Sequence, residues 1–87
     1  MAWKVEFSRR AEKQIDHLPQ SVRSQVLKVL HRAAASEDPK TFAKPLYGEW
    51  SGYWRFRSGD YPAICEIDRQ SVTVLVIEVG HRSRIYR

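Results

Sequence analysis

The segment Val72-Thr73-Val74-Leu75-Val76-Ile77-Glu78-Val79 is almost continuously apolar and rich in β-branched side chains. A run of this kind is typical of a strand that is covered on both faces and lies inside a sheet. Gly80 ends the run, and the polar sequence Asp68-Arg69-Gln70-Ser71 before it predicts a turn. Residues 61–67 precede that turn and predict a neighbouring strand. Pro62 lies at its start, and because proline has no backbone N–H to donate, it fits a strand end or an edge position.

Further toward the N-terminus, Tyr53-Trp54-Arg55-Phe56-Arg57 alternates aromatic and cationic residues. Successive side chains of a strand point to opposite faces, so Trp54 and Phe56 are expected in the core. The other three side chains, Tyr53, Arg55 and Arg57, are expected to project together from the opposite face. Ser58-Gly59-Asp60 predicts a tight turn into the next strand.

The beginning of the chain predicts a strand followed by a helix. Trp3, Val5 and Phe7 alternate with polar residues, which is typical of a strand with one buried face. Ser8 is suited to cap the helix, because its side-chain oxygen can accept a hydrogen bond from an early backbone amide. The apolar residues of this helix recur at helical spacing and are Ala11, Ile15 and Leu18.

A second helix is expected to follow directly, with Pro19 at its first position and its end near Ser36. Its apolar stripe consists of Val22, Val26, Val29, Leu30 and Ala33. The short connection between the two helices predicts an antiparallel hairpin. Glu37-Asp38-Pro39 then begins a loop that runs through Lys44-Pro45 to Gly48.

The predicted order of elements is therefore β-α-α-β-β-β. We expect an α+β fold in which one face of a mostly antiparallel sheet packs against the N-terminal helical hairpin. A chain of 87 residues suffices for one small domain, so residues 1–87 are expected to form a single folding unit.

The chain is basic, because 15 Lys and Arg residues outnumber 10 Asp and Glu residues and give a formal charge of +5. This balance favours an anionic partner, which is most often a nucleic acid or an acidic protein. A solvated basic surface that binds no partner is the alternative.

Cys65 is the single cysteine, so a disulfide within the chain is impossible and no Cys–His pattern for a metal is present. Its apolar strand context predicts a buried and unreactive thiol. The N-terminus lacks the apolar run of a signal peptide, and no stretch approaches the roughly 18 apolar residues of a membrane span. We therefore expect a cytoplasmic protein that does not associate with a membrane.

Four motifs, taken in order, resemble the RelE/ParE toxin superfamily, and its RelE branch most closely. They are Leu18-Pro19 with Val22-Arg23, Lys44-Pro45-Leu46 with Gly48, Gly52-Tyr53-Trp54-Arg55-Phe56-Arg57 with Gly59-Asp60-Tyr61, and Val79-Gly80-His81-Arg82 with Tyr86. The resemblance covers essentially the whole chain. It implies the RelE-like fold and the toxin of a type II toxin–antitoxin pair.

The resemblance also implies a reaction. RelE-like toxins enter the ribosomal A site and cut the mRNA there, without a metal or another cofactor. The ribose 2′-OH attacks the adjacent phosphate, the 5′-oxygen leaves and a cyclic phosphate remains. A cognate antitoxin neutralises the toxin, and operator DNA is bound only through the toxin–antitoxin complex.

Four residues are candidates for catalysing this cleavage: Arg55, His81, Arg82 and Tyr86. They match family positions, and histidine in addition is the side chain most readily used as an acid or base near neutral pH. Arg82 matches the family's catalytic arginine and is expected to bind the phosphate as a planar fork. We expect Arg55 to stabilise charge, His81 to transfer protons and Tyr86 to stack on or orient a nucleotide.

Five further residues are candidates for binding RNA: Lys44, Tyr47, Tyr53, Arg57 and Arg84. Many RelE relatives carry arginine where this chain has Tyr47 and Pro62, so two phosphate-binding cations are missing. Lys44 and Arg84 are candidate substitutes, and stacking on a base is an alternative role for Tyr47.

Other roles stay open at this point. Arg57 can instead pair with Asp60 or Glu66. His81 can be a turn residue, and Tyr86 can simply pack on the domain. Two histidines, His17 and His31, are expected on solvated helix faces. For the whole protein, the alternatives are a ParE-like inhibitor of DNA gyrase without nuclease activity, and a catalytically silent relative that binds an antitoxin.

Overall fold

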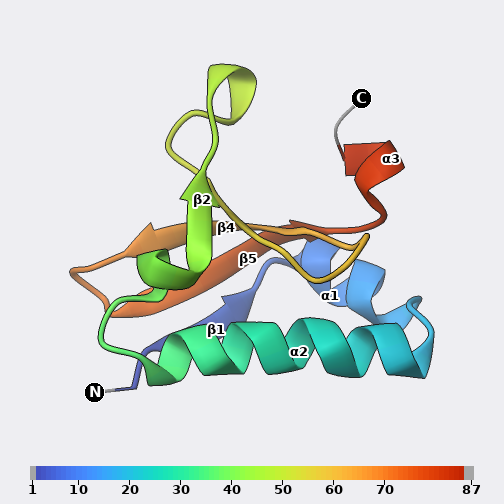
Figure 1. The fold of residues 1–87 in the computed structure, drawn as a ribbon, viewed down its shortest axis with the longest axis horizontal. Helices are drawn as coiled ribbons and strands as arrows, with labels where there is room; N and C mark the ends of the chain where they lie inside the picture. Colours follow the sequence, from blue (N-terminus) through green and yellow to red (C-terminus); the bar gives the residue numbers. More distant parts are fainter. Residues whose placement is uncertain (1, 86–87) are drawn as a thin grey trace.

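The computed structural model describes residues 2–85. At its centre is a five-stranded sheet with the strand order β1-β5-β4-β3-β2 (Figure 1). In that order the strands span Lys4–Phe7, Thr73–Val79, Ala63–Asp68, Trp54–Phe56 and Ala43–Pro45. β1 runs parallel to β5, and the other neighbouring pairs are antiparallel. The predicted α+β class and mostly antiparallel sheet are confirmed.

β5 lies between β1 and β4, and none of its residues is exposed, which confirms the interior strand predicted from its apolar run. Its register against β4 shifts where Ile64 pairs with Glu78 and Cys65 pairs with Val76. One residue of β5 is therefore unpaired, which is a β-bulge. Because of the bulge, the next core position in β5 is occupied by Val79 and not by Glu78.

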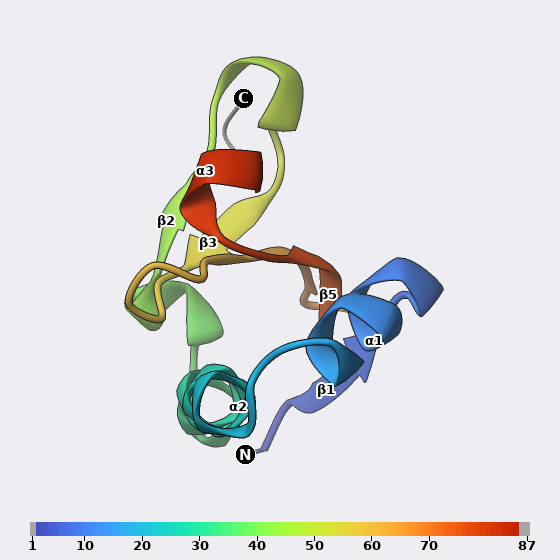
Figure 2. The same cartoon turned by 90° about the vertical axis from the view of Figure 1, so that its right-hand side faces the viewer.

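Two helices follow β1 along the chain. The Ser8 hydroxyl accepts a hydrogen bond from the Ala11 amide at 3.0 Å, which confirms Ser8 as the N-cap of α1 (Arg9–Asp16). α2 (Gln20–Ala35) begins one residue later than expected, because Pro19 is its N-cap and not its first helical residue. Figure 2 views α2 end-on, with α1 joined to it by a short connection. None of the helices in residues 2–85 has the length and apolar character needed to cross a bilayer.

The core is shared by both helices and three strands. α1 packs against β5 and β1, while α2 packs against β1 and the 3-10 helix η1 (Pro39–Phe42). The buried residues of this core are Ala11, Ile15, Val26, Leu30, Ala33, Phe56, Ala63, Cys65, Val74, Val76 and Val79. The apolar positions predicted for the two helices and for Phe56 thus meet in one cluster.

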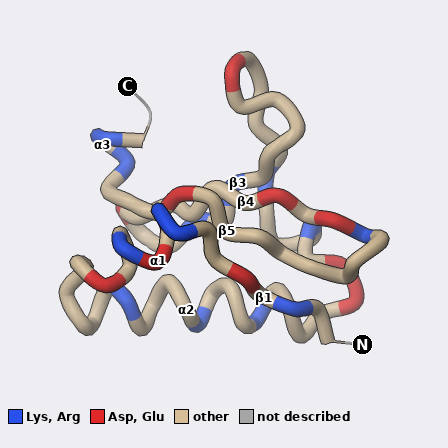
Figure 3. Tube along the Cα trace, turned by 180° about the vertical axis from the view of Figure 1, so that it is seen from behind, with Lys and Arg blue, Asp and Glu red and all other residues tan. Residues whose placement is uncertain are grey.

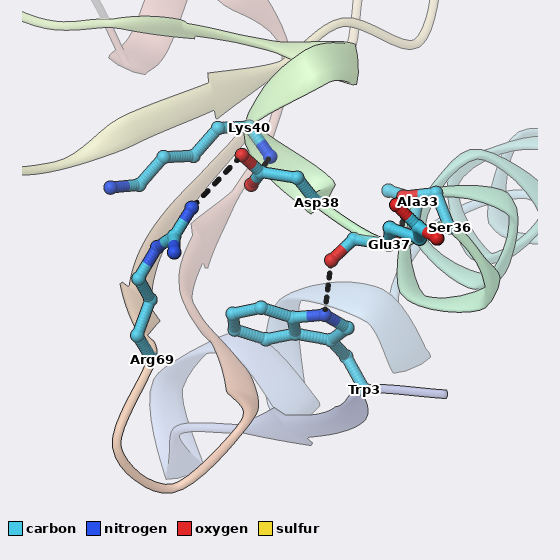
Figure 4. Close-up of polar contacts among 7 residues, drawn as sticks. All are labelled: Trp3, Ala33, Ser36, Glu37, Asp38, Lys40 and Arg69. Atoms are coloured by element: carbon cyan, nitrogen blue, oxygen red, sulfur yellow. Dashed lines mark hydrogen bonds and ion pairs between the residues drawn. The ribbon is translucent and has the colours of Figure 1, made fainter. Parts of the chain in front are cut away.

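The end of α2 is tied to segments that are distant in the sequence (Figure 4). The Trp3 amide donates to the Ala34 carbonyl at 2.7 Å, and its indole Nε1 donates to the Glu37 carbonyl at 3.1 Å. Arg69, in the β4–β5 turn, lies 3.2 Å from Asp38, measured from Nη2 to Oδ2. These contacts fix the point at which the chain leaves α2 and enters the sheet.

Besides the two 3-10 helices, one strand and one α-helix were not expected from the sequence. β2 forms in the segment predicted as a loop, because its backbone pairs with β3 although Lys44-Pro45 lacks an apolar alternation. The tail after Gly80 forms the short helix α3 (Arg82–Ile85), whose Ile85 is buried. The β2–β3 loop contains the 3-10 helix η2 (Gly48–Trp50), and Figure 1 shows this loop and α3 rising from the same side of the molecule.

Candidate functional site

The first group of predicted site residues gathers where β2 meets β3. Lys44 and Arg55 are cross-strand partners, so their side chains share the face of the sheet opposite Phe56. They line a hollow of about 180 Å³, which we call the β3 hollow. Its lining consists of Thr41, Phe42, Ala43, Lys44, Arg55 and Arg57. The pairing of β2 thus adds Lys44 to the two arginines that the strand pattern brings together.

The three cations of the β3 hollow have no carboxylate partner in the described part of the chain. Arg57 is exposed, but Arg55 is half-buried, which differs from the fully projecting side chain that was expected. Within residues 2–85 the Arg55 Nε is shielded from solvent and has no hydrogen-bond partner. An anion with several oxygens would relieve the repulsion among three like charges, and it would also satisfy Nε if the Arg55 guanidinium turns toward it.

The pairing of Arg57 with Asp60 or Glu66, considered above, is not formed in the described residues. The ion pairs found there join Arg10 to Glu78, Arg69 to Asp38 and Arg82 to Asp60. Asp60 is turned toward α3 and not toward β3, so Arg57 keeps its charge available.

The predicted tyrosines of the first group belong to the protruding β2–β3 loop. Tyr47 is 81% exposed, and nothing in its position resembles a core role. Tyr53 precedes β3 and meets Trp50 edge-on, with 5.6 Å between ring centroids. Trp54 is half-buried rather than fully in the core, and Lys40 Nζ lies 5.1 Å from the centre of its ring. The loop therefore presents one widely exposed aromatic ring, Tyr47, and a pair of rings in contact with each other, Trp50 and Tyr53.

The second group of predicted site residues lies on the C-terminal segment. The Arg82 amide donates to the Asp60 carbonyl at 2.8 Å, which docks the start of α3 on the β3–β4 turn. The Arg82 guanidinium Nε lies 3.7 Å from Asp60 Oδ1, and both side chains are 64% exposed. Figure 3 shows basic positions on α3 and no acidic ones. Arg82 is thus an exposed cation held loosely at the surface.

His81 immediately precedes α3 and is fixed by close contacts. Its Nδ1 accepts a hydrogen bond from the Ser83 amide at 3.2 Å and lies 2.8 Å from the Ser83 hydroxyl. Its ring meets Tyr61 edge-on, with centroids 5.3 Å apart. The backbone bond has the geometry of a helix cap, so the turn role of His81 is present. Within residues 2–85 no hydrogen bond involves its Nε2 atom, which is therefore available for chemistry.

A larger hollow, of about 700 Å³, lies between α1 and the C-terminal segment, and we call it the α1 hollow. His81 and Arg84 line it from one side, and Arg10, Lys13 and His17 line it from α1. The α1 residues were not among the candidates. His17 is exposed, as expected for a solvated helix face, and it also borders this hollow. No local pattern reports their position, because it depends on how α1 docks against β5.

The structure therefore divides the predicted residues. Lys44, Arg55 and Arg57 share the β3 hollow, whereas His81 and Arg84 share the α1 hollow. Arg82 lies beside Asp60. Tyr86, a candidate for nucleotide stacking, lies outside the described residues.

Residues 2–85 contain no group of three or more His, Cys, Asp or Glu side chains arranged to hold a metal ion. Cys65 is fully buried in β4, as expected. Burial raises the pKa of the Cys65 thiol far above its ordinary value, because a thiolate would lose its hydration there. The thiol is accordingly not a nucleophile in the folded protein.

Known proteins match this chain over nearly its whole length. The family described as "ParE toxin of type II toxin-antitoxin system, parDE" matches residues 5–86. The chain is 31% identical over all 87 residues to Toxin RelG of Mycobacterium tuberculosis and covers 99% of that protein. Among solved structures, it is similar to the RelBE2 toxin–antitoxin complex of Mycobacterium tuberculosis, with a TM-score of 0.84 at 26% identity. That match covers 95% of this chain and 94% of the other.

The intact E. coli RelBE toxin–antitoxin complex is also similar, with a TM-score of 0.74 at 28% identity over 92% of this chain and 96% of that one. These matches confirm the resemblance that the motifs of the sequence indicated, and they extend it to the three-dimensional fold. The chain therefore belongs to the ParE toxin family of type II toxin–antitoxin systems, within the RelE/ParE superfamily.

Proposed function

We propose that this toxin is a RelE-like endoribonuclease that cuts mRNA in the ribosomal A site and so inhibits translation. One observation carries the proposal: Lys44, Arg55 and Arg57 gather in the β3 hollow without carboxylate partners in the described chain, and Arg55 keeps an unsatisfied, shielded Nε. A cationic hollow with an unsatisfied guanidinium is suited to a phosphodiester, which is an anion with several acceptor oxygens.

The proposed reaction is an internal transesterification that needs no metal. The 2′-OH loses its proton to a base, and its oxygen forms a bond to the adjacent phosphorus. The bond from phosphorus to the 5′-oxygen breaks, and the leaving oxygen takes up a proton. The products are a 2′,3′-cyclic phosphate and a 5′-hydroxyl. Positively charged groups lower the barrier because negative charge builds up on the phosphoryl oxygens in the transition state.

The residues take separate roles in this proposal. Arg82 leaves the exposed Asp60 and binds the scissile phosphate, an exchange that costs little because exposed ion pairs contribute about 0–1 kcal/mol. Arg55 adds a second cation, and His81 moves a proton. Tyr86 stacks on or orients a nucleotide.

Recognition of the RNA beyond the scissile phosphate falls to the remaining candidates. Lys44, Arg57 and Arg84 bind neighbouring phosphates, and Tyr47 and Tyr53 offer rings to bases. Tyr47 is well placed for this, because four-fifths of its surface is exposed on the protruding loop.

A cognate antitoxin is the second proposed partner. The similar RelBE2 and RelBE structures are toxin–antitoxin complexes. We propose that an antitoxin neutralises this toxin as well, that its acidic residues meet the toxin's cations, and that the complex, but not the free toxin, binds operator DNA. The proposed place of action is the cytoplasm, where translating ribosomes are found.

Primer extension on a reporter mRNA in a reconstituted translation reaction tests the nuclease. Wild-type toxin should cut within the A-site codon, and Arg82→Ala should lower the cleavage rate about 100-fold or more, as loss of a transition-state contact does. Arg32→Ala is the matched control, because Arg32 is an exposed arginine on α2.

Antitoxin affinity should change less than about tenfold, or 1.4 kcal/mol, in Arg82→Ala. Loss of both cleavage and antitoxin binding would mean that Arg82 holds the fold or the interface. Intact translation with no cuts by the wild-type toxin would remove the nuclease proposal.

Two observations favour a second candidate, a ParE-like inhibitor of DNA gyrase. The matching family is described as the ParE toxin, and Tyr47 and Pro62 stand where many RelE relatives carry arginine. Gyrase supercoiling assays with purified toxin distinguish the candidates. Inhibition of supercoiling without mRNA cuts would favour the gyrase inhibitor, and a stable antitoxin complex without any growth arrest would favour a silent relative.

A further inference from the structure

Two histidines line the α1 hollow, and the Nδ1 atom of one faces a hydrogen-bond acceptor while the Nδ1 atom of the other faces a donor. His17 Nδ1 lies 2.7 Å from the Lys13 carbonyl oxygen. A carbonyl only accepts hydrogen bonds, so His17 Nδ1 carries a proton. His81 Nδ1 instead faces the Ser83 backbone N–H at 3.2 Å. An amide N–H only donates, so His81 Nδ1 presents its lone pair, and the proton of the neutral ring sits on Nε2.

The Ser83 side chain adds a contact that the backbone cannot provide. Its hydroxyl lies 2.8 Å from the same Nδ1 and can either donate or accept. When His81 is neutral, the hydroxyl can donate to Nδ1. When the ring takes up a second proton, the hydroxyl can rotate and accept the new Nδ1–H, whereas the backbone N–H then faces a proton and loses its bond. Ser83 therefore offers His81 a partner in both protonation states.

The ring of His81 is also restrained on its face. Tyr61 meets it nearly perpendicular, at 87° between the ring planes. Ser83 fixes one ring nitrogen and Tyr61 packs against the ring, so the free nitrogen, Nε2, is held in one direction. A group that must donate a proton in one direction gains rate from such restraint.

We propose that Ser83 is a positioning residue that sets the tautomer of His81 and presents Nε2–H to the substrate. The role in catalysis rests on the proposed nuclease function. His81 then acts on the leaving side of the reaction. As the 2′-oxygen–phosphorus bond forms and the phosphorus–5′-oxygen bond breaks, the proton on Nε2 of the doubly protonated ring passes to the 5′-oxygen. The ring is left in the Nδ1–H form, which the Ser83 hydroxyl stabilises by accepting a hydrogen bond from Nδ1–H, and exchange with water restores the Nε2–H form that the Ser83 amide favours. Water takes the proton of the 2′-OH, and Ser83 keeps its contact to Nδ1 throughout.

Nitrogen NMR of the full-length toxin tests the tautomer without any nuclease assay. Long-range proton–nitrogen spectra of the ¹⁵N-labelled protein, recorded where the rings are neutral, distinguish the two forms. His81 should appear as the Nε2–H form and His17 as the Nδ1–H form, which makes His17 an internal reference. An Nδ1–H form at His81, or an even mixture, would overturn the proposal.

Two variants then separate the backbone contact from the hydroxyl. Ser83→Pro removes both, and proline is tolerated in the first turn of a helix. It should give mixed tautomers at His81, and an unchanged Nε2–H form in a folded Ser83→Pro would show that Ser83 does not set the tautomer. Ser83→Ala keeps the backbone N–H and should keep the Nε2–H form.

Cleavage supplies the second readout. Ser83→Ala should lower the single-turnover cleavage rate at saturating toxin about tenfold with the affinity for the programmed ribosome unchanged, and Ser83→Thr should restore the rate. Ser24→Ala, which alters an exposed serine of α2, is the control and should cleave like the wild type. Wild-type rates in Ser83→Ala would overturn the positioning role. If the wild-type toxin cuts no mRNA, the proposed function fails, while the NMR result still decides whether Ser83 sets the tautomer.

Discussion

Strands β5 and β3 belong to one sheet but use their two faces differently. β5 has strands on both sides and seven residues of which none is exposed. β3 has three residues, and its fully buried Phe56 is a neighbour of the half-buried Arg55. β3 thus gives one face to the core and leaves the other face to charge.

The comparison indicates that the residues that stabilise the fold and the residues proposed for activity lie in different parts of the toxin. β5 and the two helices supply most of the buried apolar surface, which is the main favourable term in folding. The candidate site lies on short elements at the margin of the core: β2, β3 and α3. Substitutions on the two faces of β3 should therefore have opposite consequences.

Phe56→Ala should have the largest effect on folding. Its aromatic ring is completely buried between the helices and the sheet, so truncation leaves a cavity and should cost about 3–5 kcal/mol in the free energy of unfolding. Urea denaturation followed by circular dichroism measures this cost. A loss below about 1 kcal/mol would mean that this face of β3 is not part of the core.

Arg55→Ala, one position away, should spare the fold and impair the reaction. Its unsatisfied Nε gains no hydrogen bond from the described residues, so the free energy of unfolding should change by about 0.5 kcal/mol or less. The cleavage rate should fall about tenfold or more, and Arg55→Lys should recover only part of it, because lysine lacks the planar fork. An unfolded Arg55→Ala would show that the two faces of β3 are not separable.

Ser8→Ala tests how β5 and α1 are joined. The Ser8 hydroxyl accepts from the Ala11 amide and donates to the Ile77 carbonyl at 2.8 Å, so it caps α1 and ties it to β5. Its loss should lower the free energy of unfolding by about 1 kcal/mol, as for other N-caps. Thermal or urea unfolding measures the change, with Ser24→Ala as an exposed control. Equal stabilities for the two variants would contradict the cap.

Cys65 should give the smallest effect, and only in alkali. Burial raises the pKa of its thiol above the ordinary 9.0, so the unfolded chain loses this proton at a lower pH than the folded chain does. Its contribution to stability is complete well below pH 9.0 and declines as the pH approaches and passes that value. Between pH 8 and 9.5 the decline should be about 0.8 kcal/mol.

Cys65→Ala should lack this decline, whatever its overall stability. The measurement is the difference between the two proteins in the pH dependence of urea unfolding, because other groups that titrate in this range are common to both. Identical pH dependence in the two proteins would mean that the thiol ionises in the folded state.

Much of the core was predictable because it depends on neighbours along the chain. The apolar run of β5 and the helical spacing of Ala11 and Ile15 report burial locally, and both are confirmed. The alternation around Phe56 is confirmed for Phe56 itself, whereas Trp54 and Arg55 are both half-buried. The Ser8 cap is likewise a local signal. The motifs for the toxin family were visible at the same level, because they are short and occur in the right order.

The arrangement of the site was decided by tertiary structure. Lys44 joins Arg55 only because the backbone of β2 pairs with β3, a strand that no apolar alternation indicates. Asp60 meets Arg82 because α3 docks on the β3–β4 turn, and His17 comes to the α1 hollow because α1 packs against β5. Local patterns record which face of an element is apolar, whereas contacts between distant segments depend on how those apolar faces pack together. The sequence by itself therefore determined the two long helices, the other four strands, the core and the kinds of residue available for chemistry, and packing decided which of these residues meet.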